Sequence, residues 1–334
     1  MKNPNKLTYT QIAREAGVSE ATVSRVLNGD TRVNPERAAR VHETVAKLGY
    51  KKNRAASALA SGRTGLVAVV IDDDLSVFAD PFWAIVTSGV SRVLMEHNVQ
   101  TQLLVGINTQ AQERVSSFLD PAAVDGAIFF QVHDENLIYQ LEQDGLPVVM
   151  AGTPDIHLHF LHADTDNVGG AKLATQHLID RGRVNIATIT GEIDASAGAQ
   201  RLNGFLSVHE NLGRVVPKSM IAHGDYTHDS GFAAMKKLLD NNEKIDGVFA
   251  ANDLMAVGAM AAINDRGLRV PSDIAVVGFD DSIVAQTCRP QLTTVRQDIA
   301  GLGAAAAELM VAQLQGEQPK PKLLETSLVI RETT

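Results

Sequence analysis

Cysteine and aromatic residues are scarce in this chain. Cys288 is the only cysteine among 334 residues, so an internal disulfide is impossible, as is usual in a reducing compartment. Aromatic residues make up 4% of the chain, although hydrophobic residues make up 45%. The cores must therefore be built mainly from Ala, Val, Leu and Ile, a composition that favours helices packed on parallel strands.

Targeting signals and long apolar runs are missing as well. The N-terminal stretch MKNPNKLTYT has no apolar segment of the kind that a signal peptide needs. No run of about 18 apolar residues, the length of a membrane-spanning helix, occurs in the sequence. We therefore expect a cytoplasmic protein that makes no contact with a membrane.

The sequence also lacks the common motifs of catalysis and cofactor binding. It has no GxSxG elbow and no phosphate-binding loop, and GLGAAA at 301–306 does not stand in a strand-to-helix turn. His157, His159 and His162 alternate with no carboxylate or cysteine set around them, which is more typical of a solvated strand than of a metal site. We expect no enzymatic activity, no cofactor and no metal.

Charge is divided unevenly along the chain. Residues 1–63 hold 12 Lys and Arg against 5 Asp and Glu, a net charge of +7. The remainder holds 18 against 34, a net charge of −16, which gives −9 for the whole chain. A small basic segment on an acidic body indicates a polyanionic partner for that segment alone.

The basic segment has the pattern of three short helices. Apolar residues at helical spacing predict helices over about 10–16, 19–27 and 35–48. Ser19 is a good N-cap, and Asn34 followed by proline is a strong helix start. Two helices joined by a very short turn, with a third helix closing the core, form a helix-turn-helix.

The second predicted helix, within GVSEATVSRVLNG, carries side chains that can read DNA. Glu20, Ala21 and Arg25 fall on the face opposite its apolar residues. Arg can bind guanine, Glu can accept from cytosine, and Ala can contact a thymine methyl group. An ordinary solvated surface helix is the alternative. Residues suited to phosphate oxygens or to shaping the helix ends are Thr22, Ser24 and Asn28.

Residues 51–65 are basic, rich in alanine and interrupted by glycine, which is typical of a linker. Residues 54–60 could form a helix too short to persist without a partner surface. Leu59 would be exposed on such a helix and could wedge between base steps in the minor groove, or it could instead pack on the neighbouring domain.

From residue 66 onward, apolar strand patterns alternate with helical patterns. The expected strands are 66–71, 100–107, 126–132, 147–152, 184–190, 220–224, 246–252 and 274–280. The helices expected between them include 82–97, 167–181, 199–212, 230–241 and 254–266. Repeated βα units predict two α/β lobes with parallel sheets covered on both faces. A small ligand would lie between the lobes, at the carboxyl ends of the strands.

Ordered motifs along the chain resemble one known family. They include TYTQIAREAGVSEATVSRVLNG, HLIDRGRVNIATITG, QRLNGF, ANDLMAVGAMAAINDRGLRVPSDIAVVGFDD and PQLTTVRQDIAGLGAAAAELM. In this order they resemble the lac repressor (LacI/GalR) family of bacterial transcription regulators, and the resemblance covers essentially the whole chain.

The resemblance implies a set of DNA-binding residues. Glu20 and Ala21 match the positions that select the operator sequence, Arg25 matches a base-reading arginine, and Leu59 matches the hinge leucine that intercalates. The DNA-binding set is expected to be Thr8, Tyr9, Ser19, Glu20, Ala21, Thr22, Ser24, Arg25, Asn28, Arg32, Val33, Tyr50, Asn53, Ala56 and Leu59.

The resemblance also implies an effector site. Arg201 matches an arginine that grips the effector, and Asp280 matches an aspartate that accepts hydrogen bonds from it. Such a pair beside aromatic residues suits a polyhydroxylated ring. Gly152, where several members carry a polar contact, and the small residues 195–200 argue for a compact ligand with few anionic groups. The effector-binding set is expected to be Asp72, Phe82, Trp83, Arg201, Tyr226, Asn252, Asp253 and Asp280.

The expected fold is an all-α helix-turn-helix head followed by an α/β body of two parallel-sheet lobes, like a periplasmic binding protein. The head would span 1–50, a hinge helix and linker 51–65, and the effector-binding and dimerisation domain 66–334. Lobe 1 would take about 66–162 with 297–320, and lobe 2 about 163–294 with the C-terminal end.

The expected function is a transcription regulator that binds a palindromic operator as a homodimer and is modulated by a sugar, polyol or nucleoside-like effector. The chain stops without a leucine-heptad tail, which predicts a dimer and not a tetramer. A sugar-binding transport receptor shares the two-lobe architecture but would leave the basic segment unexplained. A sugar-modifying enzyme would need a nucleophile or base that the sequence does not supply. The choice between repression and activation, and the sign of the effector's influence, stay open.

Overall fold

A computed structural model describes most of the chain. It divides into two compact units, Met1–Thr64 and Gly65–Thr334, here called the head and the body. Each unit is described by itself. The described residues are 7–27, 30, 32–50, 62–71, 80–106, 118–130, 136–154, 160–241 and 244–334.

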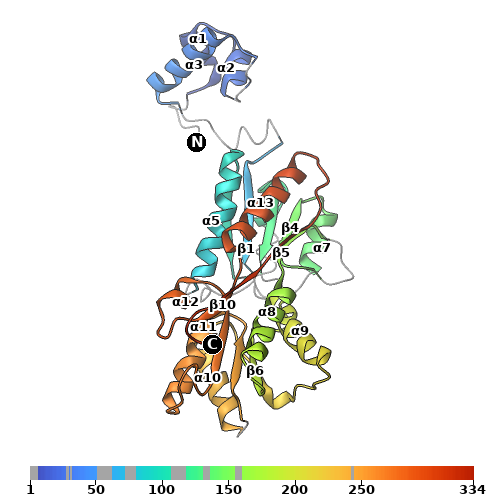
Figure 1. Ribbon diagram of the computed structural model, residues 1–334. Helices are drawn as coiled ribbons and strands as arrows, with labels where there is room; N and C mark the ends of the chain where they lie inside the picture. The colour runs from blue at the N-terminus through green and yellow to red at the C-terminus, as the bar shows by residue number, and fades with distance from the viewer. Residues whose placement is uncertain are drawn as a thin grey trace. The chain divides into compact units, whose positions relative to one another are not determined.

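The head consists of three helices around a small apolar core (Figure 1). They are α1 (Tyr9–Ala16), α2 (Glu20–Leu27) and α3 (Pro35–Leu48). Ile12, Val23 and Val41, one from each helix, are completely buried. The helical spacing of these apolar positions places them on the inner faces and thereby fixes how the three helices pack.

Capping residues set the ends of the head helices. Thr8 and Gln11 form a capping box at the start of α1, and Gly17 ends α1 with a φ of 65°. The Asn34 side chain accepts from the first backbone amides of α3, and Gly49 ends α3 in the left-handed region. The predicted helix-turn-helix is therefore present, with its boundaries within a residue or so of those expected.

The described part of the body contains two six-stranded sheets. The first has the order β11-β5-β4-β3-β1-β2 with every pairing parallel, and the second has the order β12-β10-β9-β8-β6-β7, in which only β12 is antiparallel to its neighbour. The strands of the first sheet are β1 (Leu66–Ile71), β2 (Gln100–Val105), β3 (Gly126–Phe130), β4 (Val148–Ala151), β5 (His162–Thr165) and β11 (Lys322–Leu324). Those of the second are β6 (Ile186–Thr190), β7 (Ile221–His223), β8 (Gly247–Ala250), β9 (Ala275–Asp280), β10 (Thr293–Arg296) and β12 (Ser327–Val329).

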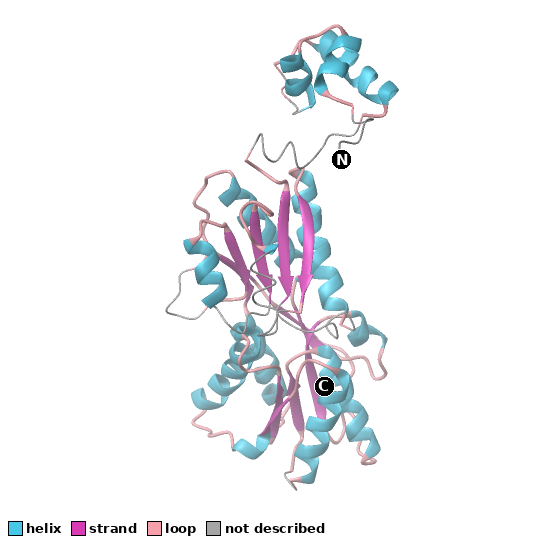
Figure 2. Cartoon of the chain, turned by 180° about the vertical axis from the view of Figure 1, so that it is seen from behind, coloured by secondary structure: helices cyan, strands magenta, loops and turns pink. Residues whose placement is uncertain are grey.

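Helices cover both faces of each sheet (Figure 2). In the first lobe, α5 (Pro81–Glu96) and α13 (Ile299–Leu314) pack on one face and α7 (Asn136–Gln143) packs on the other. In the second lobe, α8 (Asn167–Asp180) and α9 (Ser196–Asn211) share one face, and α10 (His228–Asp240) and α11 (Asp253–Asp265) share the other. The remaining short helices are η2 (Lys218–Met220) and α12 (Ile283–Thr287).

The eight predicted strands are all present, and four further short strands were not predicted. These four are β5, β10, β11 and β12, and each has only three or four residues. The sequences HADT and TTVR are too short and too polar to stand out as buried strands. The first sheet therefore extends to Thr165 and to Leu324, beyond the lobe boundaries expected near 162 and 320.

None of the helices in the described part of the chain combines the length and the apolar character that crossing a bilayer requires.

One buried histidine makes the stability of the second lobe sensitive to acid. The ring of His209 on α9 packs on that of Phe205 in a tilted arrangement with 4.8 Å between centroids, and its Nε2 has no hydrogen-bond partner among the described residues. Burial, with a smaller contribution from the charge of Arg214, lowers the pKa of His209 from its ordinary value of 6.5. The folded state therefore favours neutral imidazole.

We expect the His209→Leu variant to lose less stability on acidification than the natural protein. In the unfolded chain this histidine takes up a proton near pH 6.5, so its stabilising effect is complete above that pH and is lost as the pH falls. The loss can reach about 1.4 kcal/mol per pH unit. Urea unfolding at about pH 7.5 and about pH 5.5 measures it. The exposed His97→Gln variant is the control, and equal losses in all three proteins would contradict the prediction.

Candidate functional sites

Arg201 and Asp280 lie together at the carboxyl edge of the second sheet. Arg201 projects from the second turn of α9, Asp280 is the last residue of β9, and both are buried. Arg201 Nη1 lies 3.8 Å from Asp280 Oδ1. The guanidinium carbon is 3.7 Å from the centroid of the Phe279 ring, a cation–π arrangement. Arg201 also donates from Nε to Asn167 Oδ1 at 2.8 Å and from Nη1 to the Ala251 carbonyl at 2.5 Å. The arginine is thus held rigidly while its charge faces the aspartate.

Buried carboxylates outnumber the arginine at this site. Burial raises the pKa of Asp280 well above its ordinary value, and the neighbouring Asp253 and Asp80 raise it further, while Arg201 opposes them. Burial also raises the pKa of Asp253 to about 7 and raises the pKa of Asp80. The raised pKa values mean that these carboxyl groups are partly protonated near neutral pH, so the site offers both hydrogen-bond donors and acceptors to a polyhydroxylated ligand.

Asp80 is a site residue that the sequence did not single out. It precedes α5 in the first lobe, and its Oδ1 accepts from the Phe82 amide at 2.8 Å, as an N-cap does. Burial raises the pKa of Asp80, and the positive charge of Arg201 in the second lobe lowers it by a smaller amount. The two side chains therefore interact electrostatically between the lobes. The sequence offers one signal here, an aspartate before a proline at a helix start. This pattern predicts a helix N-cap and does not indicate a ligand contact.

Tyr226 brings an unsatisfied hydroxyl to the same site. Its backbone is left-handed with a φ of 68°, and its ring packs against Gly191, where an added Cβ would lie 2.1 Å from Cζ. Its Oη is buried with no hydrogen-bond partner among the described residues, and burial raises the pKa of Tyr226 to about 12. A buried hydroxyl without a partner is costly, so a ligand that bonds to it would be favoured.

Asn252 and Asp253 are occupied by protein partners. Asn252 Oδ1 caps α11 by accepting from the Met255 amide at 2.9 Å, and its Nδ2 donates to the Tyr226 carbonyl at 2.9 Å. The Asp253 carboxylate accepts from the amide and hydroxyl of Ser282 at 2.7 and 2.9 Å. Its other oxygen accepts from the Thr294 hydroxyl at 2.5 Å. These bonds hold the frame of the site, and the ligand contacts expected of both residues stay predictions.

Of the two aromatic residues expected at the opposite side, the structure places Trp83 in the core of the first lobe. Its ring is edge-on to Phe130 at 6.2 Å, and only 7% of the residue is exposed. Phe82 is half-buried and lies edge-on to Trp83 at 5.2 Å. The spacing of successive helical residues explains this, because adjacent side chains of α5 cannot both face the same way.

Small residues let the two lobes touch. Gly152, after β4, has a φ of 128°, and an added Cβ there would lie 2.9 Å from Ser196 Oγ at the start of α9. Beside this contact, Asp164 at the end of the first sheet accepts from Gln200 Nε2 at 3.2 Å. The predicted small residues therefore serve close packing between the lobes.

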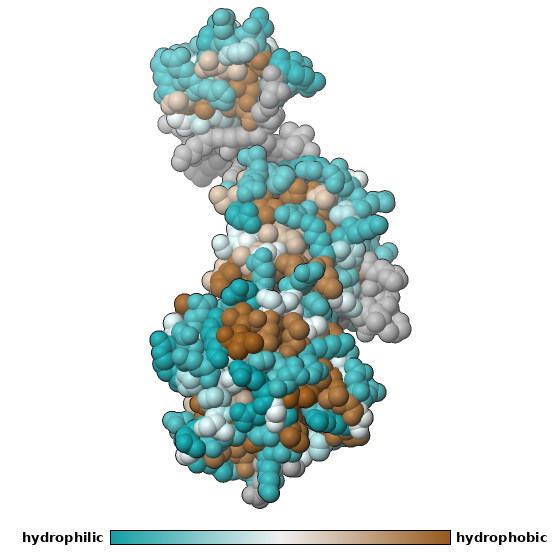
Figure 3. Space-filling view, viewed as in Figure 1, coloured by the Kyte–Doolittle hydropathy of each residue, from teal (hydrophilic) through white to brown (hydrophobic). Residues whose placement is uncertain are grey.

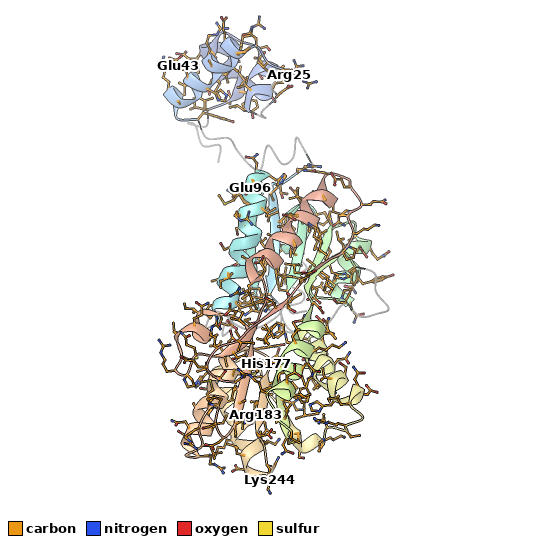
Figure 4. All side chains as sticks on the ribbon, in the orientation of Figure 1. Arg25, Glu43, Glu96, His177, Arg183 and Lys244 are labelled. Atoms are coloured by element: carbon orange, nitrogen blue, oxygen red, sulfur yellow. The ribbon has the colours of Figure 1, made fainter. Side chains whose placement is uncertain are left out.

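In the head, α2 presents the expected recognition face. Glu20, Ala21 and Arg25 are exposed, whereas Val23 and Val26 are buried, as the helical spacing predicted. Arg25 lies on a different side of the head from Glu43 (Figure 4). Two other expected DNA-binding residues, Thr8 and Ser19, cap α1 and α2. The ring of Tyr9 packs on that of Tyr50 with centroids 6.0 Å apart. The expected residues of intermediate exposure are Tyr9, Thr22, Ser24, Val33 and Tyr50.

Arg32, an expected DNA-binding residue, is engaged by a carboxylate of its own loop. Its Nε and Nη2 donate to the two oxygens of Asp30, each at 2.9 Å, although the arginine side chain is 88% exposed. This bidentate bond lowers the pKa of Asp30 to about 2. A DNA phosphate must compete with Asp30 for the same guanidinium.

We expect Asp30→Asn to raise the affinity of the protein for non-specific duplex DNA about two- to fivefold at low salt and to steepen the salt dependence. The reason is that Arg32 becomes free to bind a phosphate. Fluorescence anisotropy with a random duplex measures the effect. Glu43→Gln removes an equal charge elsewhere on the head, and an equal gain in both variants would show that net charge alone is responsible.

Five of the expected site residues lie outside the described residues, and their roles stay predictions. They are Asn28, Asn53, Ala56, Leu59 and Asp72. His157 and His159 also lie outside, and the described residues contain no group of three potential metal ligands.

Comparison with known proteins identifies the family. A model for bacterial regulatory proteins of the lacI family matches residues 8–53, and a model for a periplasmic binding protein-like domain matches residues 175–334. The HTH-type transcriptional regulator CelR of Thermobifida fusca is 39% identical over the full length of both chains. The chain belongs to the lacI family. It is a ligand-responsive bacterial transcription regulator and not an enzyme, as the sequence predicted.

Solved structures of family members have the same fold. A CelR–cellobiose complex is 38% identical and superimposes with a TM-score of 0.78 over 98% of this chain and 100% of the other. A lac repressor dimer bound to operator and the anti-inducer ONPF is 28% identical, with a TM-score of 0.86 over 98% and 99%. The predicted fold class, a helical head with a body like a periplasmic binding protein, is confirmed, and the transport-receptor alternative is not favoured.

Proposed function

We propose that this regulator binds an uncharged sugar between its lobes, with a β-linked glucose disaccharide such as cellobiose as the first candidate. The observation that carries the proposal is the buried Arg201–Asp280 pair beside the unpartnered hydroxyl of Tyr226. An arginine beside a carboxyl group can make strong hydrogen bonds to sugar hydroxyls, and the nearby ring of Tyr226 can cover an apolar sugar face. The relative CelR was solved with cellobiose, which supports this choice of sugar.

The effector is tested by thermal shift and calorimetry. Cellobiose, glucose, ribose, a polyol, a nucleoside and a sugar phosphate are compared at equal concentration, because a bound ligand stabilises the native state by mass action. We expect a neutral sugar to raise Tm and the sugar phosphate to have a smaller effect. A preference for the phosphorylated sugar would overturn the proposed class of effector.

The head, residues 1–50, is proposed to bind a palindromic operator in the cytoplasm, with 51–65 as hinge and linker and 66–334 as the effector-binding and dimerisation domain. The exposed side chains of Glu20, Ala21 and Arg25 support this assignment of the recognition face. Two heads on a two-fold axis would read two half-sites.

A homodimer is proposed from apolar surface on the body. Ile85 and Met95 on α5 and Ile283 on α12 are exposed. Figure 3 shows several apolar patches on the face of the body that is turned toward the viewer. Such patches are typical of interaction surfaces. The related lac repressor was solved as a dimer, and sedimentation of the full chain at micromolar concentration tests the proposal.

Arg25→Ala is expected to weaken binding to a selected operator by about 5- to 150-fold, the loss of one bidentate contact to a base. The operator is first selected from a random duplex pool. Affinities for the operator and for single-base variants of it then show relaxed specificity at one position of each half-site. Arg14→Ala, at an exposed arginine of α1, should weaken binding evenly across sequences. An even loss in Arg25→Ala as well would remove Arg25 from base recognition.

A further inference from the structure

Three chain segments cross between the sheets and are bonded to one another. Within the described residues, the chain passes from β5 into α8, from β10 into α13, and from β11 into β12. At the first crossing, the Asp166 amide donates to the Leu324 carbonyl at 2.8 Å, and the Thr326 hydroxyl donates to the Asp166 carbonyl at 3.4 Å. The first and third crossings are thus joined through backbone groups.

Gln297 joins the first and second crossings through its side chain. It lies between β10 and α13 and is 5% exposed. Its Oε1 accepts from the Thr165 hydroxyl at 2.9 Å, and its Nε2 donates to Asp280 Oδ1 at 2.6 Å. One amide therefore bonds both to the neighbouring crossing and to the carboxylate proposed to bind the sugar.

The same bonds continue to the arginine of the site. Asn167 Nδ2 donates to the Thr165 carbonyl at 3.1 Å, and Asn167 Oδ1 accepts from Arg201 Nε at 2.8 Å. With the Arg201–Asp280 approach this closes a ring of buried polar groups from the site through both crossings and back. Every member has a protein partner, so the ring has a defined geometry.

A shift at Gln297 would be passed on to the first lobe. Gln297 stands two residues before the start of α13, next to its N-cap Asp298. Helix α13 packs closely on α5. An added Cβ at Gly303 would lie 2.1 Å from the Val86 carbonyl oxygen, and one at Gly89 would lie 2.2 Å from that of Ala300. Backbones in such close contact move together, because neither helix can shift alone without a clash.

We propose that Gln297 is the positioning residue that couples sugar binding at Asp280 to the joint between the lobes; this rests on the proposed function. A sugar hydroxyl that donates to Asp280 competes with the Gln297 amide. The oxygen of the same amide accepts a hydrogen bond from Thr165. A change at Asp280 therefore also alters the bond between Gln297 and Thr165, which links the two crossings. The two lobes then adopt a different angle. The sugar shifts the equilibrium between the sugar-free and the sugar-bound arrangement of the lobes, and the operator affinity changes with it.

The test uses full-length Gln297→Met, which keeps the length of the side chain and removes both bonds. Operator affinity is measured with and without saturating cellobiose, and cellobiose binding is measured by calorimetry. We expect sugar-free operator binding to stay within about threefold of the natural protein and sugar binding to persist and to tighten, because the competing amide is gone. The ratio of the two operator affinities should fall by at least about fivefold, within the usual range of allosteric coupling. Thr165→Val should act in the same direction, and Thr165→Ser, which keeps the hydroxyl, should restore the ratio.

An unchanged ratio in both Gln297→Met and Thr165→Val overturns the proposal. If the natural protein responds to no sugar, the proposed function fails, and the coupling is then judged by hydrogen exchange of the Asp166 amide at the crossing. Gln297→Met should speed this exchange at least about fivefold, because a supporting bond is lost. Unchanged exchange would overturn the role of Gln297 independently of any effector.

Discussion

Arg201→Met is expected to weaken sugar binding by at least about 100-fold and to make operator affinity independent of sugar, because two charge-assisted hydrogen bonds to the ligand are worth about 3 kcal/mol or more. The substitution also leaves Asn167, the Ala251 carbonyl and Asp280 without their buried partner. Calorimetry with cellobiose and operator titration measure the two losses.

Two further variants show whether the loss is specific to Arg201. Arg201→Lys keeps the charge without the planar fork and should recover only part of the affinity. Arg183→Met removes an arginine of the same lobe, labelled in Figure 4, that donates to the Pro271 carbonyl at 2.8 Å and to none of the site residues named above. We expect it to bind sugar normally. Equal losses of sugar affinity in Arg183→Met and Arg201→Met would assign the effect to stability.

Gly258→Ala is expected to lower the free energy of unfolding by about 3 kcal/mol, at the upper end for one added methyl group in a packed core. An added Cβ at Gly258 on α11 would lie 2.0 Å from the His228 carbonyl oxygen and 2.8 Å from the Phe232 amide nitrogen, both on α10. The obstacle is backbone, so α10 and α11 must separate. Urea unfolding followed by circular dichroism measures the change.

The matched control is Val257→Ala, at the half-buried neighbouring position of the same helix. It removes two methyl groups and adds no clash, so a cost of about 1 kcal/mol is expected. If Gly258→Ala lowers the free energy of unfolding by no more than this control, the backbones of α10 and α11 are farther apart than in the structure and the prediction is wrong.

The predictions from sequence were most successful where the signal is local. The helices of the head and the eight main strands of the body were recognised because apolar spacing, caps and turn residues lie within a few positions of each other. Arg201 and Asp280 were identified through the family motifs QRLNGF and VGFDD, and the structure brings them together. Trp83 was expected at the ligand, but it is buried in the core of the first lobe. Its neighbour Phe82, on the first turn of α5, is the residue that remains partly exposed.

The site residues that were missed depend on distant partners. Asp80 reads as a helix cap, and Gln297 reads as an unremarkable polar residue before a helix. Thr165 and Gln297 are separated by 132 positions, and no local pattern relates them. The four missed strands are short segments that gain their pairing only when the two sheets are in place.

The sequence by itself determined that a basic helical head precedes an acidic body of repeated βα units, because charge, periodicity and capping are properties of neighbouring residues. The tertiary structure alone decided how the chain crosses between the sheets and which buried polar groups meet there. A buried polar group must find a partner, but the chain order does not say which one, since the partner is supplied by whichever element the packing of the apolar faces brings beside it.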